Sequence, residues 1–168
     1  FDDIVRMQID IETTGFDARS NRAEILVVAL STNRGRREVL DVADLGEAGV
    51  LQTLTERIQQ IDPDVIEGHN LFNFDLPFLI ERARQHGVTL AWGRDGSPPR
   101  IGGTQRFKAG ARTIPYQAVS IFGRHIVDTY QQIQRYDTAN ELESYGLKQS
   151  IDALGLTHPD RVFIPGDE

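Results

Sequence analysis

Two carboxylates, Asp10 and Glu12, stand at the end of the first apolar run of the chain and constrain what that run can become. The run predicts a strand, whose side chains alternate between two faces, so both acids share the face opposite Ile9 and Ile11. Neighbouring acids on an inner strand repel each other unless their charges are neutralised. The pattern therefore predicts either surface acids at a fraying strand end or ligands for Mg²⁺ or Mn²⁺, which prefer hard oxygen donors.

A second acidic motif lies between a short strand and a helix. A proline and a glycine bound the predicted strand Val65–Gly68, and apolar residues at helical spacing predict the helix Leu76–His86. Asp75 stands at the start of that helix, where a capping carboxylate contributes about 1 kcal/mol. Asn70 has a similar structural interpretation as a turn residue after the strand. Taken alone, neither residue indicates a catalytic or metal-binding site.

Together, the two motifs resemble those of the DEDD family of 3′–5′ exonucleases, and most of all the proofreading domain of archaeal-type family B DNA polymerases. The family motif D-x-E-T matches residues 10–13, and the motif N-x3-F-D matches residues 70–75. The similarity extends to three further segments, 62–66, 87–97 and 123–130. Because the matches occur in order and at similar intervals over nearly the whole chain, they are more specific than either motif alone.

The resemblance implies that the chain hydrolyses phosphodiester bonds with two divalent ions, Mg²⁺ or Mn²⁺, held about 3.5–4 Å apart. It implies that Asp10 bridges both ions, that Glu12 holds the ion carrying the attacking water, and that Asp75 holds the other. The three carboxylates should therefore converge in the folded chain. The implied substrate is single-stranded DNA entering 3′ end first, with Thr13 and Asn70 against the terminal nucleotide.

The interval 94–124 is basic and rich in glycine and proline, which favours an extended loop or an irregular hairpin. It holds six basic residues against one acid, so a cationic arm that contacts phosphates competes with a solvated insertion of chance charge. Phe107, Tyr116 and Phe122 can either stack on bases or pack within a hairpin. The candidate nucleic-acid contacts are Thr13, Asn70, Phe74, Arg106, Lys108 and Arg112.

Apolar spacing and turn residues predict the remaining elements. The predicted strands are Val5–Glu12, Glu24–Ser31, Arg37–Val42, Val65–Gly68 and His125–Val127. The predicted helices are Ala48–Ile61, Leu76–His86, Asp128–Arg135 and Tyr145–Leu154. A three-stranded meander followed by strands that alternate with helices indicates an α/β fold. We expect a ribonuclease H-like mixed five-stranded sheet with flanking helices and an inserted basic hairpin or loop.

The third motif of the family, Tyr-x3-Asp or His-x4-Asp, has no counterpart, because Tyr145 and Asp152 are seven residues apart. We therefore expect residues 1–168 to be one exonuclease domain that is cut before this motif. The fourth carboxylate and the tyrosine that orients the nucleophile would lie further along a longer protein, which can include a polymerase module. The 168-residue chain should then be impaired as an enzyme.

Three other residues receive structural interpretations. Asp128 precedes a helical pattern, so we interpret it as a helix cap and not as a further metal ligand. We interpret Trp92 and His125 as packed side chains of the core. The histidines lack partners at zinc-ligand spacing, so the sequence does not predict a zinc site.

Charge and composition exclude several classes of protein. The formal net charge of −7 argues against a protein that coats nucleic acids, although acids that hold cations are consistent with a nuclease. The sequence contains no apolar run long enough to span a membrane and nothing that resembles a signal peptide. It has no cysteine, which excludes a disulfide framework and is compatible with a cytoplasmic protein.

Two other functions remain open at this point. An RNA-trimming exonuclease of the same superfamily would use the same chemistry and differ only in the surroundings of the 2′-hydroxyl. A catalytically inactive nucleic-acid-binding domain would explain the missing third motif. The presence of Asp10, Glu12 and Asp75 together argues against that second alternative, since an inactive domain does not need them.

Overall fold

The chain forms a mixed sheet, four helices and a separate hairpin in the computed structural model, which describes residues 3–157. The strands are β1 (Arg6–Thr13), β2 (Ile25–Thr32), β3 (Arg37–Asp41), β4 (Val65–Gly68), β5 (Arg100–Ala109), β6 (Arg112–Ser120) and β7 (His125–Asp128). The helices are α1 (Val42–Ile61), α2 (Asp75–His86), α3 (Thr129–Tyr136) and α4 (Leu147–Ala153).

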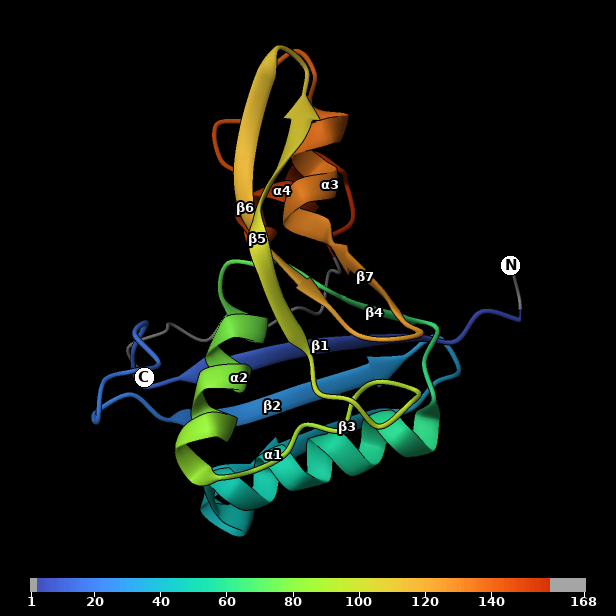
Figure 1. Cartoon of the computed structure of the whole chain (residues 1–168). Coiled ribbons are helices and arrows are strands. Elements are labelled where there is room, and N and C mark those ends of the chain that lie inside the picture. Colours follow the sequence, from blue (N-terminus) through green and yellow to red (C-terminus); the bar gives the residue numbers. More distant parts are fainter. Residues whose placement is uncertain (1–2, 158–168) are drawn as a thin grey trace.

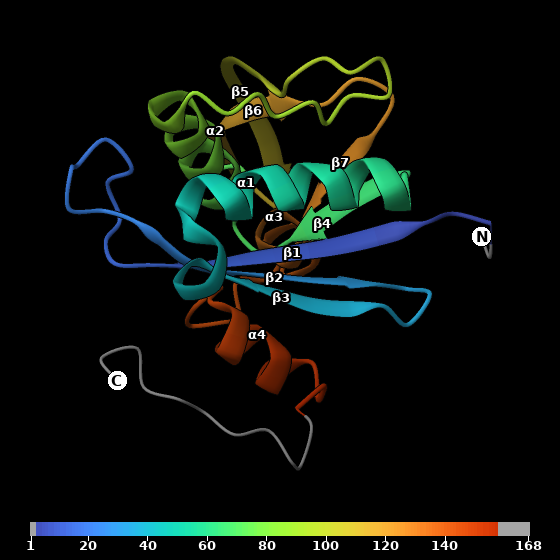
Figure 2. The ribbon, with the colours of Figure 1, turned by 90° about the horizontal axis from the view of Figure 1, so that it is seen from below.

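The five-stranded sheet has the order β3-β2-β1-β4-β7, with β1 at its centre. The meander β1–β2–β3 is antiparallel, and β4 and β7 run parallel to β1 on its other side. Helices α1 and α2 cover one face of the sheet, and α4 lies on the opposite side (Figure 2). The predicted α/β fold with a mixed five-stranded sheet is confirmed.

Apolar and polar side chains alternate along β1, so one face of the strand is buried and the other is exposed. Met7, Ile9 and Ile11 are buried, whereas Asp10 and Glu12 lie on the exposed face between them, as the sequence predicts. The apolar face of β1 packs into a core that also contains one side of α1 and one side of α2. Its principal helical members are Val50, Leu51, Leu54, Ile58, Leu76, Phe78 and Leu79.

Helix α1 begins earlier than the predicted start at Ala48. The Asp41 carboxylate caps the helix by accepting a hydrogen bond from the Ala43 amide at 2.8 Å. Gly46 then interrupts the helix with a φ of 69°, a conformation that favours glycine. The prediction missed this first segment because the glycine and the acids obscure the helical spacing.

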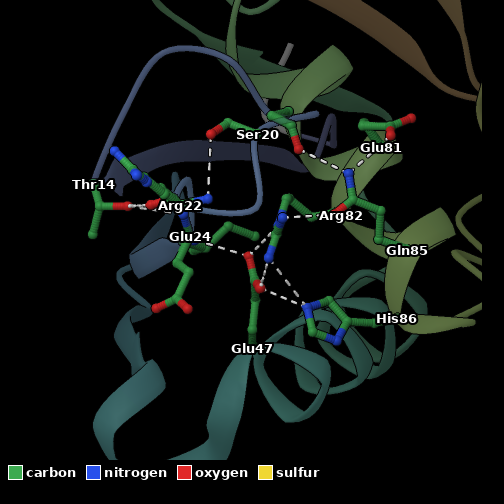
Figure 3. Close-up of polar contacts among 11 residues, drawn as sticks. Thr14, Ser20, Arg22, Glu24, Glu47, Glu81, Arg82, Gln85 and His86 are labelled. Atoms are coloured by element: carbon green, nitrogen blue, oxygen red, sulfur yellow. Dashed lines mark hydrogen bonds and ion pairs between the residues drawn. The ribbon is translucent and has the colours of Figure 1, made fainter.

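A buried ion pair fixes α2 relative to α1 (Figure 3). The Glu47 carboxylate accepts two hydrogen bonds from the Arg82 guanidinium, at 2.7 and 2.5 Å, and contacts the His86 ring at 2.5 Å. The same carboxylate accepts a hydrogen bond from the Ile25 amide of β2 at 2.9 Å. Glu47 therefore joins α1, α2 and the sheet at one point. This junction helps set the position of α2, whose first residue is Asp75.

The basic interval forms a long hairpin, β5–β6, which projects from the sheet beside α3 (Figure 1). Phe107 is buried on the side facing α3, 6.0 Å from the Tyr116 ring, with the Arg135 guanidinium 5.2 Å from its own ring centroid. Phe122 is exposed. Phe107 thus packs within the hairpin, which was one of the two interpretations left open for the aromatic side chains.

Two arginines fasten the base of the hairpin to the turn before β4. Arg94 forms ion pairs with Asp62 at 2.9 Å and with Asp64 at 2.7 Å. Arg124 pairs with Asp62 at 2.7 Å and also donates a hydrogen bond to the Trp92 carbonyl. The positive charge counted in the sequence of the interval is therefore partly neutralised by acids outside it.

Most structural interpretations of single residues are confirmed, and one is wrong. Trp92 is fully buried and donates a hydrogen bond to the Thr55 hydroxyl at 3.0 Å. The Asp128 carboxylate caps α3 by accepting a hydrogen bond from the Tyr130 amide at 2.9 Å. His125, however, is exposed, because β7 is an edge strand and not an inner one. Within residues 3–157, no helix combines the length and apolarity needed to cross a membrane.

Candidate functional site

Asp75 is tied directly to the central strand. Its side chain is buried, and its carboxylate accepts a hydrogen bond from the Ile11 backbone amide at 3.2 Å. Phe74 occupies the cap position of α2 and makes no side-chain cap bond. The alternative role of Asp75 as a helix cap is therefore not observed. Its carboxylate turns instead toward β1, beside Asp10.

The electrostatics of this pair are unfavourable when no cation is present. Burial, together with the nearby Asp10 carboxylate, raises the pKa of Asp75 to about 7. Partial desolvation also raises the pKa of Asp10, although this residue keeps an exposed surface and the charge of His69 acts in the opposite direction. A carboxyl group with such a raised pKa has lost water without gaining a full set of compensating partners. The two acids thus form a site suited to binding either a proton or a cation.

Glu12 lies on the same face of β1 as Asp10 and is exposed. Over residues 3–157, no three Asp, Glu, His or Cys side chains are placed closely enough to hold a metal ion. The structure therefore brings Asp10 and Asp75 together, but it does not complete the expected convergence with Glu12. The donor chemistry of the pair fits Mg²⁺ or Mn²⁺, since both residues offer hard carboxylate oxygens. A further ligand is needed to complete such a site.

Thr13 and Asn70, two other residues of the motifs, are held by local hydrogen bonds. The Thr13 hydroxyl donates a hydrogen bond to the Gly15 carbonyl at 2.8 Å. Asn70 adopts a positive φ of 68°, and its carbonyl accepts a hydrogen bond from the Phe74 amide at 3.0 Å. Asn70 therefore acts as the turn residue that leads into α2, and its contact with a nucleotide stays a prediction.

Phe74 contributes to an aromatic group at the start of α2. Its ring centroid lies 6.0 Å from that of Phe16 and 5.5 Å from that of Phe78. Phe16 is 92% exposed, and a pocket of about 210 Å³ lies between its loop and α2. Phe16 was not a candidate from the sequence. The signal available was an aromatic residue in a polar turn directly after the first motif.

His69 is a second residue that the sequence analysis did not select. Its ring nitrogens lie 3.0 Å from the Thr129 hydroxyl and 2.9 Å from the Tyr145 carbonyl, which fixes the ring between β4 and the segment before α4. Its charge acts on the Asp10 carboxylate. Its position next to Asn70 in the second motif was the available signal.

The candidate basic residues lie on different faces of the hairpin. Arg106 and Lys108 are exposed and share one face of β5, because they are two residues apart on a strand. Arg112 lies on the other face, donates a hydrogen bond to the Tyr145 hydroxyl at 2.7 Å and stacks over that ring at 5.2 Å. Arg112 is thus engaged within the protein, and its contact with nucleic acid stays a prediction.

The mixed sheet, the long hairpin and the two neighbouring acids, Asp10 on the central strand and Asp75 at the start of α2, define a ribonuclease H-like α/β domain. Comparison with known proteins identifies the family within this class, because residues 34–149 match the model of the family "DNA polymerase family B, exonuclease domain". The chain belongs to this family, which confirms the resemblance seen in the motifs. The match begins after β2, so the first acidic motif lies outside it.

The relatives of the chain are archaeal DNA polymerases. It is 41% identical to DNA polymerase 2 of Aeropyrum pernix over 135 residues, which cover 79% of this chain and 15% of that protein. It is 32% identical to the DNA polymerase of Thermococcus kodakarensis over 171 residues, covering 96% of this chain and 10% of that protein.

A solved structure shows the same fold. The family B DNA polymerase of the hyperthermophilic archaeon Pyrobaculum calidifontis superposes with a TM-score of 0.77 at 28% identity, over 97% of this chain and 20% of that one. The chain therefore spans about a fifth or less of the length of these relatives.

Proposed function

We propose that this domain is a 3′–5′ exonuclease that hydrolyses phosphodiester bonds of single-stranded DNA in the presence of Mg²⁺ or Mn²⁺. The domain would proofread for a family B-like polymerase. The observation that carries the proposal is the Asp10–Asp75 pair beside the central strand, where burial and the neighbouring Asp10 carboxylate raise the pKa of Asp75. Such a pair is costly for folding, and a divalent cation would relieve its repulsion.

Asp10 and Asp75 would hold the metal ions, and Glu12 would add the third carboxylate from its exposed position on the same strand face. When bound, the metals supply an activated water and neutralise charge that develops on the phosphate. The hydrogen bond from the Ile11 amide holds the Asp75 carboxylate toward β1. This contact would keep the two acids at a fixed separation, which a two-metal reaction requires.

The remaining candidate residues would hold the strand. Phe74, supported by the exposed Phe16, offers an aromatic surface on which a terminal base can stack. Arg106 and Lys108 would contact phosphates from the exposed face of the hairpin, positioning DNA without reading its sequence. Thr13 ends β1 and Asn70 lies in the turn between β4 and α2, and both would border the 3′-terminal nucleotide.

The fourth carboxylate and the orienting tyrosine would come from a third motif in a longer protein. Support for this part of the proposal comes from the relatives, all of which are several times longer than the matched region. A polymerase module in the same chain would then deliver the mismatched 3′ end.

Digestion of labelled oligonucleotides tests the proposed substrate and direction. A 5′-labelled single strand should give a ladder of shortening products in Mg²⁺ or Mn²⁺, whereas a 3′-labelled strand should release only labelled mononucleotide. RNA of the same sequence serves as the matched substrate. Faster digestion of RNA would favour the RNA-trimming alternative, and absence of cleavage by a chain that carries the third motif would favour the inactive binding domain.

A further inference from the structure

A polar cavity of about 360 Å³ lies between β6, β7 and α3. None of Asp10, Glu12 and Asp75 lines it, so it is distinct from the acidic pair. Its volume falls in the range of small-molecule sites in proteins. Its lining combines side chains of the hairpin, of the edge strand and of the first turns of α3, which are held together at this point.

Gln131 carries a buried polar atom in this lining that has no hydrogen-bond partner. It is only 5% exposed, yet its side-chain amide nitrogen makes no hydrogen bond with any described residue. A buried donor without a partner is unfavourable, and native proteins nearly always satisfy such a group with protein, water or a ligand. The amide nitrogen of Gln131 therefore needs an acceptor that the described residues do not supply.

The other available groups around the cavity also favour an acceptor-rich, negatively charged ligand. Arg135 takes part in no ion pair within residues 3–157, and its guanidinium lies over the Phe107 ring. His125 is exposed at the edge of the cavity, and Ser120 adds a hydroxyl from the end of β6. Arg124 adds a positive charge, although its hydrogen bonds are used at the base of the hairpin.

Asp128 is the one acid in the lining, and backbone amides bind both of its carboxylate oxygens. One of its oxygens accepts hydrogen bonds from the Asn70 and Tyr130 amides at 2.8 and 2.9 Å. The other oxygen accepts a hydrogen bond from the Phe72 amide at 3.0 Å. Three backbone donors thus stabilise the carboxylate, and no other side chain of the lining is acidic.

We propose that this cavity binds a phosphate group carried by a nucleotide, with the Gln131 amide and the Arg135 guanidinium donating hydrogen bonds to the phosphate oxygens. The phosphate can belong to a free mononucleotide or to one residue of a nucleic-acid strand. This site would be separate from the hydrolytic site and does not depend on metal binding there.

Isothermal titration of the 168-residue chain in EDTA tests the proposal independently of the exonuclease activity. The probes are sodium phosphate, dAMP and a short single-stranded oligodeoxynucleotide, at constant ionic strength. The variants are Arg135→Gln and Gln131→Leu, with Arg37→Gln, which replaces an exposed arginine of β3, as the matched control. Removing an unpaired buried donor should leave the melting temperature of the Gln131→Leu variant equal or higher, so loss of binding is not loss of fold.

We expect saturable binding that weakens about tenfold in each of the two cavity variants and stays unchanged in the control. Tighter binding of dAMP than of the oligonucleotide would identify a free mononucleotide, and the reverse order would identify a strand; both support the proposal. Absence of saturable binding for all three probes would overturn it. Equal affinity of the wild type, the Arg135→Gln variant and the Gln131→Leu variant would overturn it as well.

Discussion

The Asp75 carboxylate accepts a hydrogen bond from the Ile11 amide at 3.2 Å, which places the first residue of α2 beside the strand position next to Asp10. The two acids are 65 residues apart in the sequence but share one electrostatic environment. This relationship has consequences for stability, metal binding and activity that can be measured separately.

The metal-free protein should lose stability as pH rises. The pKa of Asp75 is raised from 3.8 to about 7, so between these values the folded state retains a proton that the unfolded state has released. The free energy of unfolding should therefore fall through this window and stay lower above it. Asp75→Asn removes the effect and should stabilise the protein at pH 8 by on the order of 4 kcal/mol.

Urea unfolding in EDTA at pH 5 and pH 8 measures this difference for the wild type and the Asp75→Asn variant. Asparagine keeps an oxygen that can accept the Ile11 hydrogen bond. An advantage of the variant that is the same at both pH values would mean that the carboxyl group titrates normally in the folded protein.

Divalent cations should stabilise the fold through the acidic pair. In Mn²⁺ at ten times its dissociation constant, the free energy of unfolding should rise by about 1.4 kcal/mol, because the ion binds only the folded state. Asp10→Ala should abolish this rise, whereas Glu56→Ala, which removes an exposed acid of α1, should preserve it. Thermal unfolding with and without Mn²⁺ provides the measurement, and an unchanged response of the Asp10→Ala variant would place the metal elsewhere.

Removing Glu47, which joins α1 to α2, should lower the free energy of unfolding more than removing an acid from a surface ion pair. Glu47→Ala leaves the Arg82 guanidinium buried without its partner and should cost about 3–5 kcal/mol in chemical denaturation. The matched control is Glu81→Ala, which breaks an ion pair with the largely exposed Arg84 and should cost little. Similar losses for the two variants would show that the buried pair contributes no more than a surface pair.

The two faces of the hairpin should respond differently to substitution. Replacing Arg106 and Lys108 by alanine should weaken single-stranded DNA binding and reduce the dependence of log K on log salt by about 1.4. Arg112→Gln should instead lower stability, because it breaks the contact with Tyr145. Fluorescence anisotropy at several salt concentrations and thermal unfolding separate these outcomes. A reduced salt dependence in the Arg112→Gln variant alone would show that phosphates contact the face of the hairpin that carries Arg112, and not the face that carries Arg106 and Lys108.

Local pattern predicted the sheet well, since the alternation around Ile9 and Ile11 determines which face of β1 is buried. The local pattern gave wrong predictions at positions where packing against distant segments determines burial or the start of a helix. His125 has apolar neighbours in sequence but lies on an edge strand, and the start of α1 depends on a cap and on the positive φ of Gly46. The hairpin has a register shift between Ile101 and Thr104, so alternation alone did not reveal its strands.

The candidate site was predictable only in part, for related reasons. The proximity of Asp10 and Asp75 follows from the order of the two motifs in a known family, and the structure places them together. The engagement of Arg112 with Tyr145 depends on packing between the hairpin and the segment before α4, which no local pattern records. For the same reason the sequence did not single out Phe16, which belongs to the candidate site because its ring contacts Phe74.

Digestion of a 5′-labelled single-stranded oligodeoxynucleotide in Mn²⁺ tests the central claim most directly, using a version of the protein long enough to include the third motif. The account predicts stepwise shortening from the 3′ end and a loss of about 10²–10⁴ in rate in both the Asp10→Ala and the Asp75→Ala variants, with folding preserved. The Glu56→Ala variant should keep the wild-type rate. Unchanged digestion by the two folded variants would contradict the account, because the acidic pair would then have no part in the reaction.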